Sequence, residues 1–200
     1  LVSDGYKLLF ELGALDSKQK ITATGKILAR LPMDPKLGRM LIEAEKESAL
    51  NEVLIIASAL AIQDVRERPM DKQQAADESH KKFTDNRSDF ISLLNIWHAW
   101  HKSQQKLSAG KLRQWCKENF ISWLRMREWR DTHQQIAKML DELNMRFNQQ
   151  PADYNAIHRS LLTGLLGNVG MKGDEREYIG ARNRKFLMFP GSGLFNAQPK

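Results

Sequence analysis

The sequence predicts a mainly α-helical protein: a helical bundle preceded by a partial winged helix and followed by a small, incomplete β-domain. Apolar residues recur at helical spacing before Pro151, and two short helices flanking a turn open the chain. After Pro151, short apolar segments alternate with turn-rich polar ones. These observations divide the 200 residues into segments 1–47, 48–150 and 151–200.

Segment 1–47 begins like part of a winged helix. Ser3 and Gly13 bracket a short amphipathic helix, residues 21–22 favour a brief extended piece, and a second helix ends near Leu31, before Pro32. A generic helical start explains this pattern equally well, because a complete winged helix needs one more helix. Beyond it, residues 36–47 form a helix with a single apolar stripe.

The central segment predicts a bundle. Ser48 is the expected cap of a helix over 49–64, which is apolar on nearly every side and therefore buried. Residues 70–87 are polar enough for a loop or a loosely held helix. Ser88 caps the next helix, and residues 108–110 end it.

After a short helix around Trp115, Ser122 is the expected cap of a long helix that reaches about Arg146. Its apolar residues share one arc, and its polar and basic residues share another arc, well separated from the first. The apolar arc contains Met126, Trp129, His133, Ile136, Leu140 and Leu143, and the other contains Arg127, Arg130, Gln134 and Lys138.

Segment 151–200 predicts one helix over about 153–163 and then short strands. The expected strands lie within 165–171, 177–180 and 186–189, separated by the turn-rich stretches 172–175 and 182–185. We expect the glycines at 164, 167 and 170 to serve a bent strand.

Charge and cysteine content narrow the class of protein. Lys and Arg number 14 against 15 acidic residues in 1–100, but 17 against 9 in 101–200, so the second half favours an anionic partner. Cys116 is the only cysteine, which excludes an intrachain disulfide and favours a reducing, cytoplasmic setting. The apolar run 53–62 is too short for a membrane span, and no signal peptide opens the chain. We therefore expect no membrane partner and a piece of a longer protein.

The sequence contains no pattern for nucleotide hydrolysis. A P-loop needs G-x-x-x-x-G-K-[ST], and neither Gly25-Lys26 nor Gly110-Lys111 has the required neighbours. His98 and His101 stand one helical turn apart but belong to no zinc-binding spacing. We expect no catalytic residue, bound cofactor or metal in this segment.

Ordered motifs along nearly the whole chain resemble the C-terminal region of DEAH-box RNA helicases, especially the bacterial HrpA type. The matching segments occur in the family's order. They are 12–16, 21–26, 31–37, 40–42, Arg68-Pro69 with Asp71, Ala76-Asp77, Asp89 with 93–95, Trp115-Cys116, Asn119-Phe120, 164–166, Phe189-Pro190-Gly191-Ser192 and Leu194-Phe195. Leu124 and His133 stand where many eukaryotic members have arginines.

The resemblance implies a winged-helix remnant, a helical ratchet (HA2) bundle and the opening strands of an OB-like fold. It also implies that motor domains elsewhere in the same chain bind ATP and Mg and hydrolyse the nucleotide. The present region would form one side of the single-stranded RNA channel, and protein activators or the ribosome are further expected partners.

Basic residues interleaved with aromatic ones are typical of nucleic-acid grooves, because cations meet phosphates and flat rings meet bases. The pattern includes Trp115, Lys117, Phe120, Trp123 and Trp129. We predict RNA contacts at Arg125, Arg127, Arg130, Lys138, Lys172, Arg182, Arg184 and Lys185.

Two other functions fit parts of the sequence. A protein-interaction scaffold would use the basic surface to recruit ribosomal or regulatory partners without touching the strand. A DNA-binding winged-helix regulator would rest on residues 1–47 alone, where no basic recognition helix is evident.

Overall fold

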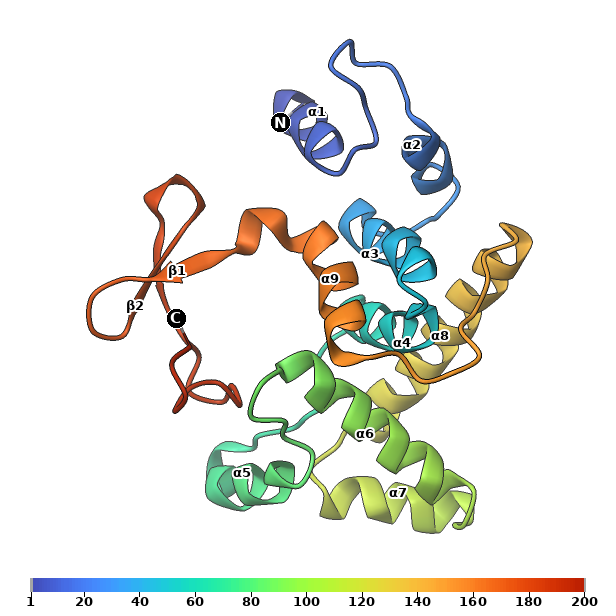
Figure 1. The fold of residues 1–200 in the computed structure, drawn as a ribbon. Coiled ribbons are helices and arrows are strands. Elements are labelled where there is room, and N and C mark those ends of the chain that lie inside the picture. The colour runs from blue at the N-terminus through green and yellow to red at the C-terminus, as the bar shows by residue number, and fades with distance from the viewer. Residues whose placement is uncertain (1, 200) are drawn as a thin grey trace. The chain divides into compact units, whose positions relative to one another are not determined.

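The computed structural model describes residues 2–199 and confirms the expected mainly helical class with a small sheet near the C-terminus (Figure 1). None of the helices described is long and apolar enough to cross a membrane. The helices are α1 (Val2–Glu11), α2 (Ala23–Leu28), α3 (Pro35–Lys46), α4 (Leu50–Leu60), α5 (Gln73–Lys81), α6 (Asp89–Gln104), α7 (Ala109–Glu118), α8 (Trp123–Glu142) and α9 (Tyr154–Leu165), and the strands are β1 (Gly170–Lys172), β2 (Glu177–Gly180) and β3 (Lys185–Leu187).

Two compact units make up the chain, and each draws on two stretches of sequence. The first unit contains residues 2–61 and 131–166, and the second contains residues 62–130 and 167–199. The boundary between them falls within α8. The expected division at residues 47 and 150 stays a prediction.

The start of the first unit contains the helix, hairpin and helix that the sequence predicts. Gly13 has a φ of 69°, a left-handed conformation that ends α1 at the expected glycine. Leu15 and Ile21 form an antiparallel bridge, and the Thr22 hydroxyl caps α2 by accepting a hydrogen bond from the backbone N–H of Gly25. A Cβ on Gly25 would lie 2.2 Å from the carbonyl oxygen of Ala14, so this turn needs a glycine.

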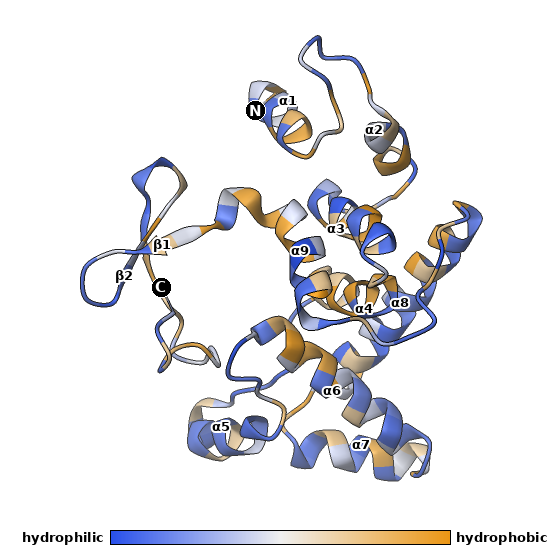
Figure 2. Ribbon diagram, viewed as in Figure 1, coloured by the Kyte–Doolittle hydropathy of each residue, from blue (hydrophilic) through white to orange (hydrophobic). Residues whose placement is uncertain are grey.

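Helices α3, α4 and α9 form the core of the first unit. α4 is buried along most of its length, as its apolar sequence predicts, and Figure 2 shows much orange on it. α9 lies close against α3, where a Cβ on Gly164 would come within 2.3 Å of the carbonyl oxygen of Lys36. The prediction that Gly164 serves a bent strand is therefore wrong: it permits two helix backbones to approach.

The prediction that Ser48 caps α4 is wrong as well. Ser48 has a φ of 53° and ends α3 instead, since its N–H bonds to the carbonyl of Glu45 and the N–H of Ala49 bonds to that of Ala44. This is the Schellman arrangement, in which the residue after the helix adopts the left-handed conformation. Ala49 therefore becomes the N-cap of α4 and supplies no side-chain bond.

A similar turn ends α8 at Glu142, a few residues before the expected end. Asn144 has a φ of 57°, and the N–H of Met145 bonds to the carbonyl of Leu140. Asparagine tolerates this conformation better than most residues. The expected apolar arc of α8 is buried at Met126, Trp129, Ile136 and Leu140.

In the second unit, an extended stretch before α5 is tied to the turn between α7 and α8. Arg66 forms a β-bridge with Ile121, the N–H of Glu67 bonds to the carbonyl of Phe120, and the N–H of Ser122 bonds to that of Val65. The polar stretch expected as a loop or a loosely held helix contains α5. These backbone bonds fix the position of the α7–α8 turn within the unit.

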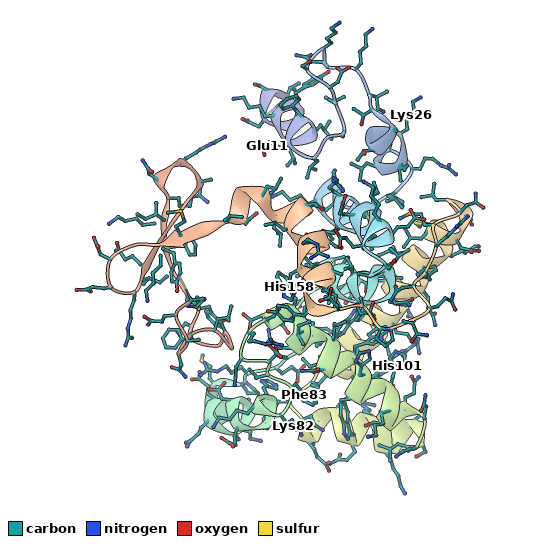
Figure 3. The ribbon with its side chains drawn as sticks, viewed as in Figure 1. Glu11, Lys26, Lys82, Phe83, His101 and His158 are labelled. Carbon is teal, nitrogen blue, oxygen red and sulfur yellow. The ribbon has the colours of Figure 1, made fainter. Side chains whose placement is uncertain are left out.

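Helix α6 carries the aromatic core of the second unit. The Ser88 hydroxyl caps it, as predicted, by accepting a bond from the N–H of Ile91. The ring of Trp97 lies 4.9 Å from that of Trp129 and 4.4 Å from that of His101, which Figure 3 labels on α6. Trp97 and Trp129 are both buried.

The three strands form an antiparallel meander in the order β1-β2-β3. Met171, Ile179 and Leu187 lie on one face and are largely exposed. Tyr178 and Phe186 stack on the opposite face with their rings 5.6 Å apart. Strand β1 is shorter than expected, because residues 166–168 form a 3₁₀ turn. The identification of this sheet as the start of an OB-like fold stays a prediction.

Candidate nucleic-acid interface

The three arginines predicted on α8 do not share one face. Arg125 and Arg127 are two residues apart, which places them about 200° apart around the helix. Arg130 is about 60° from Arg127. Arg127 is exposed, whereas Arg125 and Arg130 are half-buried. A strand lying along the exposed side of α8 would therefore meet Arg127 before the other two.

Each half-buried arginine interacts with a neighbouring group. The guanidinium of Arg125 donates a 2.7 Å hydrogen bond to the carbonyl oxygen of Asp64, which leaves other N–H donors for a phosphate. Burial of the imidazole is the main cause that lowers the pKa of His101, and the charges of His98 and then Arg130 lower it further. Arg130 therefore lies close enough to the aromatic core to affect it electrostatically.

Lys138 is exposed on α8, in the part of the helix that belongs to the first unit. It is three helical turns beyond Arg127, near Gln134 and Gln135, which are also exposed. Within residues 2–199, Lys138 forms no ion pair with another side chain. Its ammonium group is thus available to an anion from solvent.

Of the four cations predicted to contact RNA from the β-meander, two have side chains that bond to other residues of the chain, and the other two form no ion pair among residues 2–199. Lys172 donates a 3.2 Å bond to the carbonyl oxygen of Gln198, and Lys185 pairs with Glu177 at 2.8 Å. Arg182 and Arg184 are exposed at the β2–β3 turn, and neither forms an ion pair with any residue that the structure describes. The β2–β3 turn therefore presents two exposed arginines that no ion pair among the described residues neutralises.

The conformation of that turn explains why the arginines project. Arg182 and Asn183 have φ of 58° and 55°, and the N–H of Arg184 bonds to the carbonyl of Ala181. Two successive left-handed residues define a tight hairpin turn whose twist matches that of the strands. An arginine in this conformation is less favourable than a glycine.

A hollow that the sequence did not reveal lies beside α7 in the second unit. Its volume is about 590 Å³. Arg113 and Lys117, four residues apart on α7, line it together with Lys72, Phe120 and Trp123. Lys117, Phe120 and Trp123 belong to the basic and aromatic pattern of the sequence, but Arg113 and Lys72 were missed. The spacing of Arg113 and Lys117 was the available signal.

His98, His101 and Cys116 differ in their surroundings. No group of three or more His, Cys, Asp or Glu side chains is placed to hold a metal ion there. His98 is exposed and His101 is half-buried among tryptophans, so the two imidazoles have different surroundings. Burial raises the pKa of the Cys116 thiol to about 11, which keeps it protonated and unreactive at neutral pH.

Two family models match consecutive parts of the chain. The winged-helix part of the helicase-associated domain (HA2) matches residues 6–33, and its ratchet-like part matches residues 34–93. The first match confirms the expected winged-helix remnant over the generic helical start. The second covers α3 to the first turn of α6.

Curated relatives extend the similarity to the whole chain. It is 47% identical over 205 residues to the ATP-dependent RNA helicase HrpA of Escherichia coli (strain K12). It is 43% identical over 207 residues to the ATP-dependent RNA helicase HrpA homolog of Haemophilus influenzae. The matches cover all of this chain but only 16% of each relative. Residues 6–93 therefore contain the winged-helix and ratchet-like parts of a helicase-associated (HA2) domain, and the whole chain is similar to a segment of HrpA-type ATP-dependent RNA helicases.

Proposed function

We propose that this chain is the accessory RNA-binding and strand-guiding region of an ATP-dependent DEAH-box RNA helicase. In this proposal it forms one side of the channel for single-stranded RNA in a cytoplasmic protein. ATP and Mg bind to motor domains of the same polypeptide, and those domains hydrolyse the nucleotide. In this proposal the present region binds the RNA strand and does not itself hydrolyse ATP.

The observation that carries the proposal is a set of exposed cations on a segment homologous to part of an RNA helicase. Arg127, Lys138, Arg182 and Arg184 are exposed, and no ion pair among the described residues neutralises Lys138, Arg182 or Arg184. Cations that release counterions from phosphates supply most of the affinity in binding that is independent of base sequence. A channel through which RNA of any base sequence must move requires contacts of this kind, which do not depend on the bases.

Charge reversal in the full-length helicase tests the proposal. Arg127→Glu and Arg184→Glu should weaken RNA binding and lower the rate at which the helicase unwinds an RNA duplex. The rate of ATP hydrolysis without RNA should stay unchanged. Lys18→Glu is the matched control, because Lys18 is an exposed cation in the α1–α2 hairpin outside the predicted set. Unwinding that survives both reversals contradicts the proposal.

A protein-interaction scaffold is the second candidate, and exposed apolar residues on one face of the sheet favour it. Met171 and Leu187 are 75% and 68% exposed on the same face as Ile179, beside the Lys185–Glu177 ion pair. Exposed apolar clusters often mark contacts with other proteins. If Arg184→Glu leaves unwinding intact but releases a ribosomal or regulatory partner, this second function replaces the first.

A further inference from the structure

We propose that the hollow beside α7 is a binding site for one nucleotide of single-stranded RNA, with Arg113, Lys117 and Lys72 meeting phosphate and Trp123 stacking on the base. The inference rests on the proposed RNA-binding function and deepens it. It assigns the contact to residues outside the set predicted from the sequence. All of these residues belong to the second unit.

The charge of the hollow favours an anion. Three cations line it, Lys72, Arg113 and Lys117, and Glu67 is the one carboxylate on its wall. None of the three cations forms an ion pair within residues 2–199. Because all three side chains are exposed, they keep their charge in water and can exchange counterions for phosphate oxygens.

Two aromatic rings favour a nucleotide over a simple anion. Phe120 and Trp123 line the same hollow and are half-buried. Within the described part of the chain, neither ring stacks on another aromatic side chain. A flat ring beside cations is the arrangement that single-strand binding proteins use, since every base presents a π-face. An acidic peptide would satisfy the cations but would leave the rings without a matching group.

The backbone around the hollow is held in place before any ligand arrives. Phe120 has a φ of 52°, and its carbonyl oxygen accepts a 2.8 Å bond from the N–H of Glu67 and lies 3.0 Å from Nε2 of His80. The N–H of Ile121 bonds to the carbonyl of Cys116 at 2.9 Å. A wall that is ordered in advance loses less conformational entropy on binding. The volume of about 590 Å³ is in the range of ligand pockets, about 300–1,000 Å³.

The test measures binding of a fluorescein-labelled oligouridylate to the full 200-residue chain as salt is varied. Arg113→Glu and Lys117→Glu should each weaken binding about fivefold or more at low salt. Each should also make the salt dependence shallower, by about 0.7 in slope for every phosphate that the variant no longer binds. Lys111→Glu is the matched control, because Lys111 is exposed on α7 but does not line the hollow.

Stacking has a separate readout. Trp123→Leu should weaken binding about tenfold and reduce the quenching of tryptophan fluorescence by RNA, whereas Trp123→Phe should retain much of the affinity. Unchanged thermal unfolding of Arg113→Glu and Lys117→Glu would show that these charge reversals leave the fold intact. Equal RNA affinity in all of the hollow variants overturns the inference.

Other outcomes separate this inference from the proposed function. If Arg127→Glu and Arg184→Glu weaken RNA binding but the hollow variants do not, the region binds RNA elsewhere and the hollow is not its site. If the unaltered chain binds no RNA, both proposals fail. If the hollow variants lose binding of poly-glutamate but keep that of RNA, the site belongs to an acidic protein, which also overturns the inference.

Discussion

The hydroxyl of Ser192 donates a 2.6 Å hydrogen bond to the carboxylate of Asp89, the first residue of α6. The N–H of Gly193 donates to the other oxygen of the same carboxylate at 2.8 Å. A Cβ on Gly193 would lie 2.3 Å from the carbonyl oxygen of Asp85, so only a glycine fits there without a shift. The segment after β3 is thereby tied to the start of α6 within the second unit.

Replacing Asp89 with Ala should loosen that tie. Hydrogen bonds to a charged acceptor contribute about 1.5–3 kcal/mol each, and the carboxylate also favours the helix N-terminus. We expect faster hydrogen–deuterium exchange at the Gly193 amide and a lower free energy of unfolding. Ser192→Ala, which removes only one of the two bonds, should give a smaller effect. If the rate of hydrogen–deuterium exchange at the Gly193 amide is unchanged in both variants, Asp89 does not hold the segment after β3 in place.

Acid should destabilise the second unit through His101. Burial first, and then the positive charges of His98 and Arg130, lower the pKa of His101 below its ordinary 6.5. The folded state therefore holds a neutral imidazole that becomes protonated on unfolding below pH 6.5. The free energy of unfolding should fall as pH drops through 6.5 and should level off below the folded pKa.

Urea unfolding between pH 7.5 and pH 5 measures this dependence. His101→Gln should flatten the curve, because the variant has no imidazole to protonate. His98→Gln is the control: His98 is exposed on the same helix, and its loss should leave most of the slope. A slope unchanged by His101→Gln would assign the acid sensitivity to other groups.

Cys116 should resist alkylation in the folded protein. Its side chain is 1% exposed, and burial raises the pKa of the thiol to about 11, so the reactive thiolate is scarce at neutral pH. Reaction with a chromogenic disulfide should be slow in buffer and should become rapid when urea unfolds the chain. Fast labelling in buffer at pH 7 would show that α7 opens far more often than its packing implies.

Arg182→Gly should stabilise the β2–β3 turn and weaken RNA binding at the same time. Glycine adopts a φ near 58° with less strain than arginine, worth about 1 kcal/mol, but it removes one of the exposed charges of the turn. The midpoint temperature of thermal unfolding should therefore rise, while the affinity for RNA measured by titration should fall. A variant that is both less stable and equally tight for RNA contradicts this account of the turn.

Periodic apolar patterns predicted most of the helical frame. The stripe containing Met126 and Leu140, the buried helix α4 and the Ser88 cap could all be read from the sequence, because burial and capping act over a few residues. The misplaced cap at Ser48 has a different origin. Whether a serine starts one helix or ends another depends on its φ, which residue type alone does not determine.

The site was harder to predict than the frame. Charge and aromatic content located the basic half of the chain, but not that Lys185 is paired with Glu177 or that Arg125 is bonded to the backbone of Asp64. Those contacts depend on strand register and on residues 61 positions apart in sequence. The hollow beside α7 needs the α7–α8 turn to bring Trp123 near Arg113, which no local pattern specifies.

The most direct test of the account is the salt dependence of RNA binding by this chain alone. If exposed cations bind the phosphates, the affinity for a single-stranded oligonucleotide should fall steeply as the salt concentration rises. In a plot of log affinity against log salt concentration, the slope should be about −0.7 for each phosphate bound. The unaltered chain should also bind different base sequences with similar affinity. Absent binding, or an affinity indifferent to salt, would contradict the claim that this region holds RNA by charge.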